Sequence, residues 1–462
     1  MKGYEYIDDS VNLPVKYEAY SAEIKWYVNG KLLENGVFVV KEDLDHDYTA
    51  TVKCVVTSMG NTAEEEFEIY VSHLNTQEKL EDVKKTLTDM YKSLEVEGNL
   101  TLPRKDTVHG ASIDWYSYAP NMLTAKGVYT KPLADSKVTL QATISLNKEQ
   151  LIFQMDLNVK GMNPANTWDK IEAFLSRIAV EEVANQKFYL YGWETPADGF
   201  DDDYRNVPTQ NLGYLFFYTN DELNIVQDFI SKSHAGRPGK KRTSTKYITI
   251  HNTGMAHPKN NASGLNEYIH SDTTREVSWH FSVDDQGAYQ ELPVDEVAYH
   301  AGDGGRTYGT LYYNDTYKKW CFAGGNMNSV GLETCVYKGV DYNLVMRSTA
   351  KLVASLLNQY NLTVTDVRQH YDFSGKNCPQ VLRASGRWAE QLELIYLEYY
   401  ALKELQDVEF IWTSLTPEIL DNQGKVLDTR PSEATEVQYK VSVTFNGETK
   451  EYTFTSTLNA IK

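Results

Sequence analysis

Three features are scarce in this sequence: cysteine, basic side chains and long apolar runs. Four cysteines among 462 residues are too few to form a disulfide scaffold. Lysine and arginine number 45 against 64 acidic residues, and the net charge of −19 argues against nucleic-acid binding, which relies on clustered cations. No run approaches the roughly 18 apolar residues of a membrane-spanning helix. We therefore expect no membrane span and no nucleic-acid partner.

The first residues also lack the pattern of a secretory signal. After Met1 and Lys2 the chain turns acidic at Glu5, Asp8 and Asp9, whereas a signal has a basic start followed by an apolar stretch of roughly 7 to 15 residues. Either a signal was removed or export uses another route. Tyrosine (33 residues) and tryptophan (8) are plentiful. Such side chains suit both β-sheet surfaces and carbohydrate-facing clefts, and composition does not choose between these.

The chain is too long for a single hydrophobic core. One pattern of strands occurs three times along it. In each copy a tryptophan precedes a glycine, and alternating strands follow; the pairs are Trp26 and Gly36, Trp115 and Gly127, and Trp412 and Gly424. Short alternating strands around one buried tryptophan predict small antiparallel β-sandwiches. They resemble the immunoglobulin-like repeats of bacterial surface and secreted proteins.

The repeats divide the chain into five parts. We expect a first repeat at 1–75, which begins inside a longer array, and a second at 76–162 with a leading helix over Gln77 to Lys92. A spacer of unknown role follows at 163–224, with a helix predicted over Thr167 to Asn185. An α/β domain spans 225–394, and a connecting helix and a third repeat occupy 395–462. The expected fold is therefore multidomain, with a mixed β-sheet flanked by helices and all-β immunoglobulin-like sandwiches.

The α/β prediction rests on alternation between 225 and 394. Strand-like runs at Tyr247 to His251, Ser278 to Val283 and Ser329 to Val336 alternate with an amphipathic helix over Leu344 to Tyr360. A further helix is expected over Arg387 to Leu405. Alternation of this kind indicates a sheet flanked by helices.

Two motifs in this domain point to a metal. His251 ends a buried strand, and alone it favours a hydrogen-bonded structural histidine. His370 and Cys378 flank a glycine-bearing loop eight residues apart, and with His251 they give three ligands for a borderline metal. Three protein ligands with an open fourth position are typical of catalytic zinc, which lowers the pKa of its bound water to about 7.

Five motifs in order carry a resemblance over about 160 to 170 residues. They are Ile250-His251-Asn252-Thr253, Val277-Ser278-Trp279-His280-Phe281, Tyr299-His300-Ala301-Gly302-Asp303-Gly304, Val330-Gly331-Leu332-Glu333-Thr334-Cys335, and His370 through Cys378-Pro379. With them the chain closely resembles the type 2 N-acetylmuramoyl-L-alanine amidases, a family that includes phage endolysins and peptidoglycan-recognition proteins.

The resemblance implies roles for individual residues. It makes His251, His370 and Cys378 the ligands of Zn²⁺, Glu333 the catalytic glutamate, and Lys376 the cation that stabilises negative charge on the cleaved amide. Independently of the family, Glu333 stands out as the only acidic residue in the apolar run Val330 to Val336. The alternative to a catalytic role is that Glu333 forms a structural salt bridge on its strand.

Four further residues are expected to line the substrate groove: Asn252, Thr253, Trp279 and His300. Where some relatives carry a tyrosine that assists catalysis, this chain has Trp279, which has no hydroxyl. For His300, a role in bracing the site is as well supported by the sequence as a role in lining the groove. Whether Cys321 and Cys335 pair or stay free thiols is also left open.

The implied activity is peptidoglycan hydrolysis at the amide bond between the lactyl group of N-acetylmuramic acid and L-alanine. A non-catalytic peptidoglycan-binding module is the first alternative, and its marker would be a missing third ligand. A surface adhesin is the second, and it would leave the His, Glu, Lys and Cys set unexplained. Bacterial peptidoglycan is the expected partner, with a possible cell-surface ligand for the repeats. The expected location is secreted or associated with the cell wall.

Overall fold

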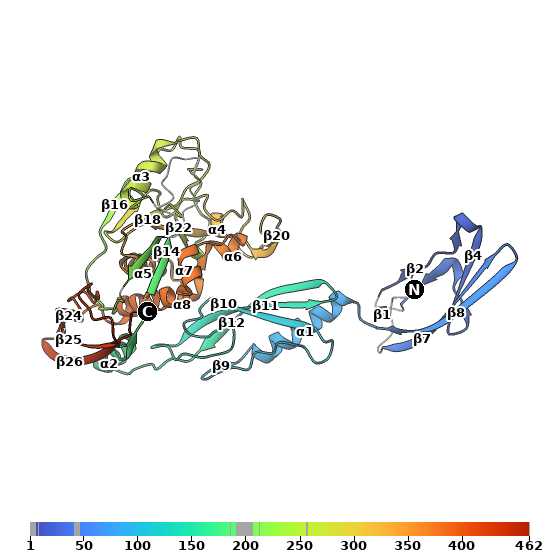
Figure 1. The fold of residues 1–462 in the computed structure, drawn as a ribbon, viewed down its shortest axis with the longest axis horizontal. Helices are drawn as coiled ribbons and strands as arrows, with labels where there is room; N and C mark the ends of the chain where they lie inside the picture. Colours follow the sequence, from blue (N-terminus) through green and yellow to red (C-terminus); the bar gives the residue numbers. More distant parts are fainter. Residues whose placement is uncertain are drawn as a thin grey trace. The chain divides into compact units, whose positions relative to one another are not determined.

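The computed structural model of the chain describes residues 6–7, 9–40, 47–184, 186–190, 207–211, 213–255 and 257–461 (Figure 1). Within these ranges no helix is long and apolar enough to cross a bilayer. The described strands form separate sheets in the different parts of the chain.

The first repeat is all β. Its strands are β1 (Tyr6–Ile7), β2 (Val11–Asn12), β3 (Lys16–Tyr17), β4 (Ala22–Val28), β5 (Lys31–Leu32), β6 (Val37–Phe38), β7 (Tyr48–Ser58) and β8 (Asn61–Val71). The main sheet has the order β1-β8-β7-β4-β3, with β5 paired to β4, and β2 and β6 form a separate pair. Trp26 and Phe38 are buried in a cluster with Ile69 and Val71, so both sheets share one core.

The second repeat begins with a helix. Its elements are α1 (Thr76–Tyr91), β9 (Glu95–Val96), β10 (Ser112–Ser117), β11 (Ser136–Leu146) and β12 (Glu149–Val159). Helix α1 starts with a capping box, in which Asn75 and Glu78 satisfy each other's backbone N–H groups. The sheet has the order β10-β11-β12-β9.

The third repeat is assembled from two segments that are far apart in sequence. Its elements are α2 (Thr167–Ile178), β13 (Glu182–Val183), β24 (Glu409–Ser414), β25 (Thr435–Phe445) and β26 (Glu448–Leu458). Strand β13 pairs in parallel with β26, and Tyr214 bridges to Lys425. The Phe217 ring stacks on Trp412 with a centroid distance of 4.4 Å. Some described parts of segment 163–224, for which the sequence predicted no role, thus contribute to this sheet and its core, namely α2, β13 and residues 213–218. The α/β domain lies between the two segments in the sequence.

The tryptophan and glycine of each repeat have the same structural role. The indole Nε1 atoms of Trp26, Trp115 and Trp412 donate to the carbonyls of Pro14, Pro103 and Tyr218 at 2.8–2.9 Å. The three glycines have positive φ, and a Cβ would lie 2.0–2.5 Å from a leucine carbonyl oxygen; the pairs are Gly36 with Leu13, Gly127 with Leu100, and Gly424 with Leu215. Only glycine tolerates both the backbone conformation and the close approach.

The α/β domain contains a six-stranded mixed sheet with the order β16-β19-β18-β22-β17-β23. These strands are β16 (Ile225–Gln227), β17 (Tyr247–Asn252), β18 (Phe281–Val283), β19 (Ala288–Gln290), β22 (Ser329–Thr334) and β23 (Val367–Gln369). Outside the sheet lie the hairpin β20 (Leu311–Asn314) and β21 (Lys319–Phe322), and a second hairpin, β14 (Gln186–Leu190) and β15 (Val207–Asn211). All pairings in the sheet are parallel except β18 with β19.

Helices surround this sheet. They are α3 (Ala262–Ser271), α4 (Gly325–Asn328), α5 (Tyr342–Tyr360), α6 (His370–Ser374), α7 (Gln380–Ser385) and α8 (Trp388–Glu404). Helix α5 packs on β17 and β18 and is itself packed against α8, which also contacts α2 of the third repeat. Every residue of β17 is buried, because the strand has a neighbour on each side.

Most predicted elements are present, but one predicted helix and one predicted strand differ from the structure by three residues or more. The helices expected at Gln77, Leu344 and Arg387 lie within two residues of their predicted bounds. The helix predicted from Thr167 to Asn185 is wrong beyond Ile178, because the chain turns to extended conformation at Ala179 and then forms β13; residue 185 itself lies outside the described residues. The strand predicted from Ser278 begins only at Phe281.

Candidate metal centre and active site

Three parallel strands bring the predicted site residues together. In the register of β17 and β22, His251 lies opposite Glu333. Strand β23 pairs with the other side of β17, and His370 follows it as the first residue of α6. Because parallel strands end at the same edge of a sheet, all three side chains meet at the carboxyl ends, where open α/β sheets generally bind ligands.

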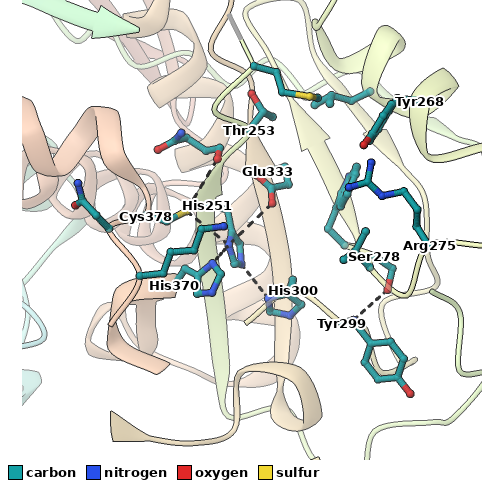
Figure 2. Close-up of a pocket in the computed structure, with 17 residues that line it drawn as sticks. His251, Thr253, Tyr268, Arg275, Ser278, Tyr299, His300, Glu333, His370 and Cys378 are labelled. Carbon is teal, nitrogen blue, oxygen red and sulfur yellow. Dashed lines mark hydrogen bonds and ion pairs between the residues drawn. The ribbon is translucent and has the colours of Figure 1, made fainter. Parts of the chain in front are cut away.

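His251, His370 and Cys378 form a compact donor cluster (Figure 2). The Nδ1 atoms of His251 and His370 are 3.0 Å apart, and Cys378 Sγ lies 3.8 Å from His251 Nδ1. All three side chains are buried, and their ligand atoms lie within 4.8 Å of one another. The structure therefore brings the three residues that the sequence selected to one point.

The electrostatics of the cluster suit a divalent cation. Burial, together with the neighbouring His370, His300 and Lys376, holds the pKa of His251 well below its usual range. Burial lowers the pKa of His370 to about 3, so both imidazoles are neutral. Burial raises the pKa of the Cys378 thiol to about 12. A bound divalent ion would supply the positive charge that favours the thiolate, and two imidazoles with one thiolate are a donor set that zinc accepts.

The histidine rings are held by neighbours. His300 Nδ1 lies 2.9 Å from His251 Nε2, and His370 donates to the backbone carbonyl of Ala301. The backbone of His300 and Ala301 is in turn anchored by Asn326, whose Oδ1 accepts from their N–H groups at 2.8 and 2.7 Å. Partners of this kind orient metal-binding histidines. His300 thus contacts His251 and also lines the pocket, a position that is compatible with both of the roles open for it.

Glu333 stands beside the cluster in a poorly solvated position. Its Oε1 lies 4.0 Å from His251 Nδ1, and its Oε2 is buried without a hydrogen-bond partner among the described residues. Burial raises the pKa of Glu333 to about 7, and the positive charge of Lys376 partly offsets this shift. A carboxyl group with a pKa near 7 can both accept and return a proton at neutral pH.

Asn252 and Thr253 line the pocket, and both also make structural hydrogen bonds. The Oδ1 of Asn252 accepts from Val381 N at 3.2 Å, and its carbonyl oxygen lies 4.0 Å from Cys378 Sγ. Thr253 Oγ1 accepts from Val336 N at 3.3 Å. The Asn252 contacts tie the end of β17 to Cys378 and to α7, and the Thr253 contact ties it to the residues that follow β22.

Trp279 forms part of the pocket wall. Its ring is buried, and Nε1 donates to Ser282 Oγ at 2.8 Å. The only polar hydrogen of the indole is thus engaged within the protein, which agrees with the absence of an acid role expected from its lack of a hydroxyl. Its neighbour His280 is also buried, and its Nδ1 accepts from Gly331 N at 3.0 Å.

The pocket extends away from the donor cluster to residues that the sequence did not single out. It encloses about 320 Å³, and Leu265, Tyr268 and Arg275 line it. The Arg275 guanidinium lies 5.0 Å from the Tyr268 ring centroid, and Figure 2 shows both residues at the end of the pocket away from His370 and Cys378. A single arginine in a polar loop carries no signal in the sequence, because only the tertiary fold brings it to the groove.

The other cysteines have no part in the cluster. Cys321 and Cys335 are buried free thiols, and Cys54 is half-buried and also free. The pairing left open for Cys321 and Cys335 is therefore absent. Their burial is that of small apolar core residues.

Comparison with family models and known relatives gives two matches along the chain. Residues 241–381 match the family described as N-acetylmuramoyl-L-alanine amidase. Residues 77–162 match the family described as atrophied bacterial Ig domain. The first match includes every donor of the cluster, Glu333 and Lys376.

Individual relatives resemble the same region. The N-acetylmuramoyl-L-alanine amidase CwlA of Bacillus subtilis (strain 168) is 34% identical over 171 residues, which are 36% of this chain and 55% of that protein. The amidase XlyB of the same organism is 38% identical over 169 residues, 36% of this chain and 47% of that protein. This chain thus spans about half the length of these relatives. A structure of the catalytic domain of XlyA is 31% identical and covers 37% of this chain and 99% of that one, with a TM-score of 0.32.

Proposed function

Because residues 241–381 match the family described as N-acetylmuramoyl-L-alanine amidase, we propose that this chain is a zinc-dependent peptidoglycan hydrolase. It cleaves the amide bond between the lactyl group of N-acetylmuramic acid and the L-alanine of the stem peptide. The observation that carries the proposal is the position of Glu333, whose carboxylate lies 4.0 Å from a ligand atom of the donor cluster at the end of the pocket. A recognition module without catalysis would need neither the thiol nor the carboxyl group.

His251, His370 and Cys378 would hold the zinc ion. When bound, zinc polarises the amide carbonyl and makes a water molecule more acidic. His300 and the Ala301 carbonyl keep the two imidazoles in position to bind.

Glu333 and Lys376 carry the proton and charge steps. Glu333 Oε2 has no partner in the described part of the chain, so it is available to take a proton from the attacking water. The same carboxyl group then protonates the departing nitrogen of L-alanine, which would otherwise be a poor leaving group. The ammonium of Lys376 lines the same pocket and stabilises the negative charge on the tetrahedral oxygen.

The rest of the chain supports this activity at a surface. We propose that the catalytic residues lie in the domain 225–394, that the immunoglobulin-like repeats hold the enzyme at or near the wall, and that the protein acts in a secreted or cell-wall-associated setting. Asn252, Thr253 and Trp279 form the wall of the groove near the scissile amide.

The test combines metal analysis with product analysis. The purified full chain is incubated with cell wall, and the released fragments are identified by mass spectrometry. The proposal expects stem peptides with a free L-alanine amino terminus and about one zinc per chain, with activity lost on chelation and restored by added zinc. Full activity in metal-free protein, or cleavage only at other bonds, would contradict it.

A further inference from the structure

The hairpin β20–β21 next to the candidate active site has two faces of opposite character. Leu311 pairs with Phe322 and Tyr313 with Trp320, so these four side chains share one face; Tyr312 pairs with Cys321, and both lie on the other face. In each strand the exposure of the side chains alternates, and the residues on the face of Tyr313 and Trp320 are more exposed than their neighbours on the other face.

The inner face of the hairpin is attached to the helix that begins at His370. Tyr312 donates its hydroxyl hydrogen to the carbonyl of Phe373 at 2.6 Å, and Lys319 Nζ lies 3.3 Å from the Tyr371 ring centroid. The hairpin also closes on the following loop, because a Cβ at Gly375 would come within 2.9 Å of Tyr317 Cβ. The hairpin therefore has a fixed position beside one of the three donors, and Figure 1 shows β20 next to α6.

The outer face exposes large side chains to solvent. Tyr313 is 41% exposed and Trp320 is 40% exposed, and their rings form an edge-to-face pair with centroids 5.5 Å apart. Leu311 on the same face and Tyr317 at the turn are exposed as well. The rings of Tyr313 and Trp320 thus form an exposed aromatic surface, and exposed apolar groups that gather in this way can mark an interaction site. Tyrosine and tryptophan are the side chains that suit partners with both apolar and polar surface, as the faces of sugar rings have.

The chemistry of the proposed substrate selects the occupant. The scissile amide joins a glycan to a peptide, so the two parts of the substrate leave the metal in different directions. The pocket runs from the donor cluster toward Tyr268 and Arg275, and a guanidinium suits the carboxylates of a peptide. The hairpin lies beside the helix that begins at His370 and beside Gly375, and its outer face is aromatic.

We propose that the outer face of the hairpin, formed by Leu311, Tyr313 and Trp320, binds the glycan strand of peptidoglycan and so aligns its peptide branch with the metal. This inference rests on the proposed function. A lipid surface is disfavoured as the occupant, because the chain has a net charge of −19 and the turn of the hairpin carries no excess of basic residues, since its exposed Asp315 and Lys318 balance each other.

The first test measures binding without hydrolysis. Glycan strands of alternating N-acetylglucosamine and N-acetylmuramic acid, freed of peptide, contain no amide that this site could cut. Titration calorimetry with the full chain should detect binding, and the double substitution Tyr313→Ala and Trp320→Ala should raise Kd by about tenfold or more, because truncated aromatic anchors dominate such interfaces. Phe229→Ala, at an aromatic residue 41% exposed in the same domain and outside the pocket lining, is the matched control and should leave Kd unchanged.

The second test separates this inference from the proposed function. The double variant should raise KM for a disaccharide-peptide substrate and keep the kcat/KM of wild type for a lactyl-peptide that lacks sugars, with an unchanged thermal midpoint and zinc content. Glycan binding that needs the hairpin in a chain that cuts no amide would overturn only the proposed function. Equal glycan affinity of wild type and double variant, no binding by wild type, or a loss confined to phosphatidylglycerol vesicles would overturn the inference.

Discussion

The ring of His300 occupies the space that a side chain at Gly331 would need: a Cβ there would lie 2.7 Å from His300 Cδ2. The same ring holds His251 through a 2.9 Å contact. A strand residue outside the donor cluster therefore limits where one of the donors can lie.

We expect Gly331→Ala to displace His300 and loosen His251. Overpacking of this kind costs about 1–3 kcal/mol of stability, and loss of a partner that orients a ligand lowers metal affinity about 10- to 100-fold. Competition with a chromogenic chelator measures the zinc affinity. Gly305→Ala, in the loop that follows His300 and with open space around its Cα, is the control and should retain wild-type affinity. Unchanged affinity in Gly331→Ala would show that His300 does not position the ligand.

Replacement of Glu333 and of Cys378 should have different consequences. Glu333→Gln should lower turnover about 10²- to 10⁴-fold, which is the usual contribution of a proton-transfer group, while zinc stays bound. Cys378→Ser should lose zinc and activity together, because a hydroxyl is a far poorer ligand than a thiolate. Bound zinc and amide cleavage are measured in parallel. Cys321→Ser, at a buried free thiol outside the donor cluster, should retain the metal. Loss of zinc in Glu333→Gln would instead identify Glu333 as a ligand or its support.

Arg275 should contribute to binding of the peptide part of the substrate. It is exposed at the far end of the pocket beside Tyr268, and an exposed ionic contact is worth about 0.2–1 kcal/mol, so Arg275→Ala should raise KM about 2- to 5-fold at unchanged kcat. Arg275→Lys keeps the positive charge, so its KM should lie between those of wild type and Arg275→Ala. The effect should shrink at high salt, since exposed charges are screened. A fall in kcat at unchanged KM would mean that Arg275 acts on the reaction itself.

Isolation of 225–394 should weaken the α/β domain. The cut severs α8 after Leu394 and removes the acceptors of Lys351 Nζ, which are the carbonyls of Thr219 at 2.6 Å and Asp221 at 2.8 Å. Each buried polar group left unpaired costs about 1–3 kcal/mol. We expect a piece spanning 163–461 to have a higher thermal midpoint than 225–394, measured by calorimetry, with 225–407 between them. Equal midpoints for all three would mean that the third repeat does not stabilise the catalytic domain.

Part of the loss of stability with rising pH should come from the buried carboxyl group of Glu398, in addition to that from other carboxyl groups whose pKa burial raises, such as Glu333. Burial raises the pKa of Glu398 from its ordinary value of 4.5 to about 7, and Lys351 at 3.8 Å only partly offsets this. Between these values the folded protein holds a proton that the unfolded chain has lost, so the contribution is fully present below pH 4.5 and is lost as pH rises through 7.

Substitution by a neutral isostere tests this dependence. Glu398→Gln should remove it and raise the free energy of unfolding above pH 7, by at most about 3 kcal/mol for a shift of this size. Urea denaturation between pH 4 and 8 measures it, and Glu436→Gln at an exposed position of β25 is the control. Parallel pH profiles for wild type and Glu398→Gln would contradict the assignment.

The sequence by itself determined the local elements and the donor set. Apolar periodicity located the helices over Gln77 to Lys92 and Leu344 to Tyr360 within two residues, because amphipathic spacing reflects which side of a helix is buried. The strand that begins at Tyr247 was evident from its short run of mostly apolar and β-branched residues, which is typical of a buried strand. The two histidines and the thiol were selected by residue type and motif, since few side chains bind zinc.

Only the tertiary structure decided how distant segments combine. The pairing of β13 with β26, the insertion of the α/β domain into the third repeat, the contact of His300 with Gly331 and the position of Arg275 in the pocket all join residues far apart in sequence. A local pattern records whether a segment is buried, but it does not record which partner buries it. That choice depends on the free energy of the whole arrangement, in which register and packing are decided together.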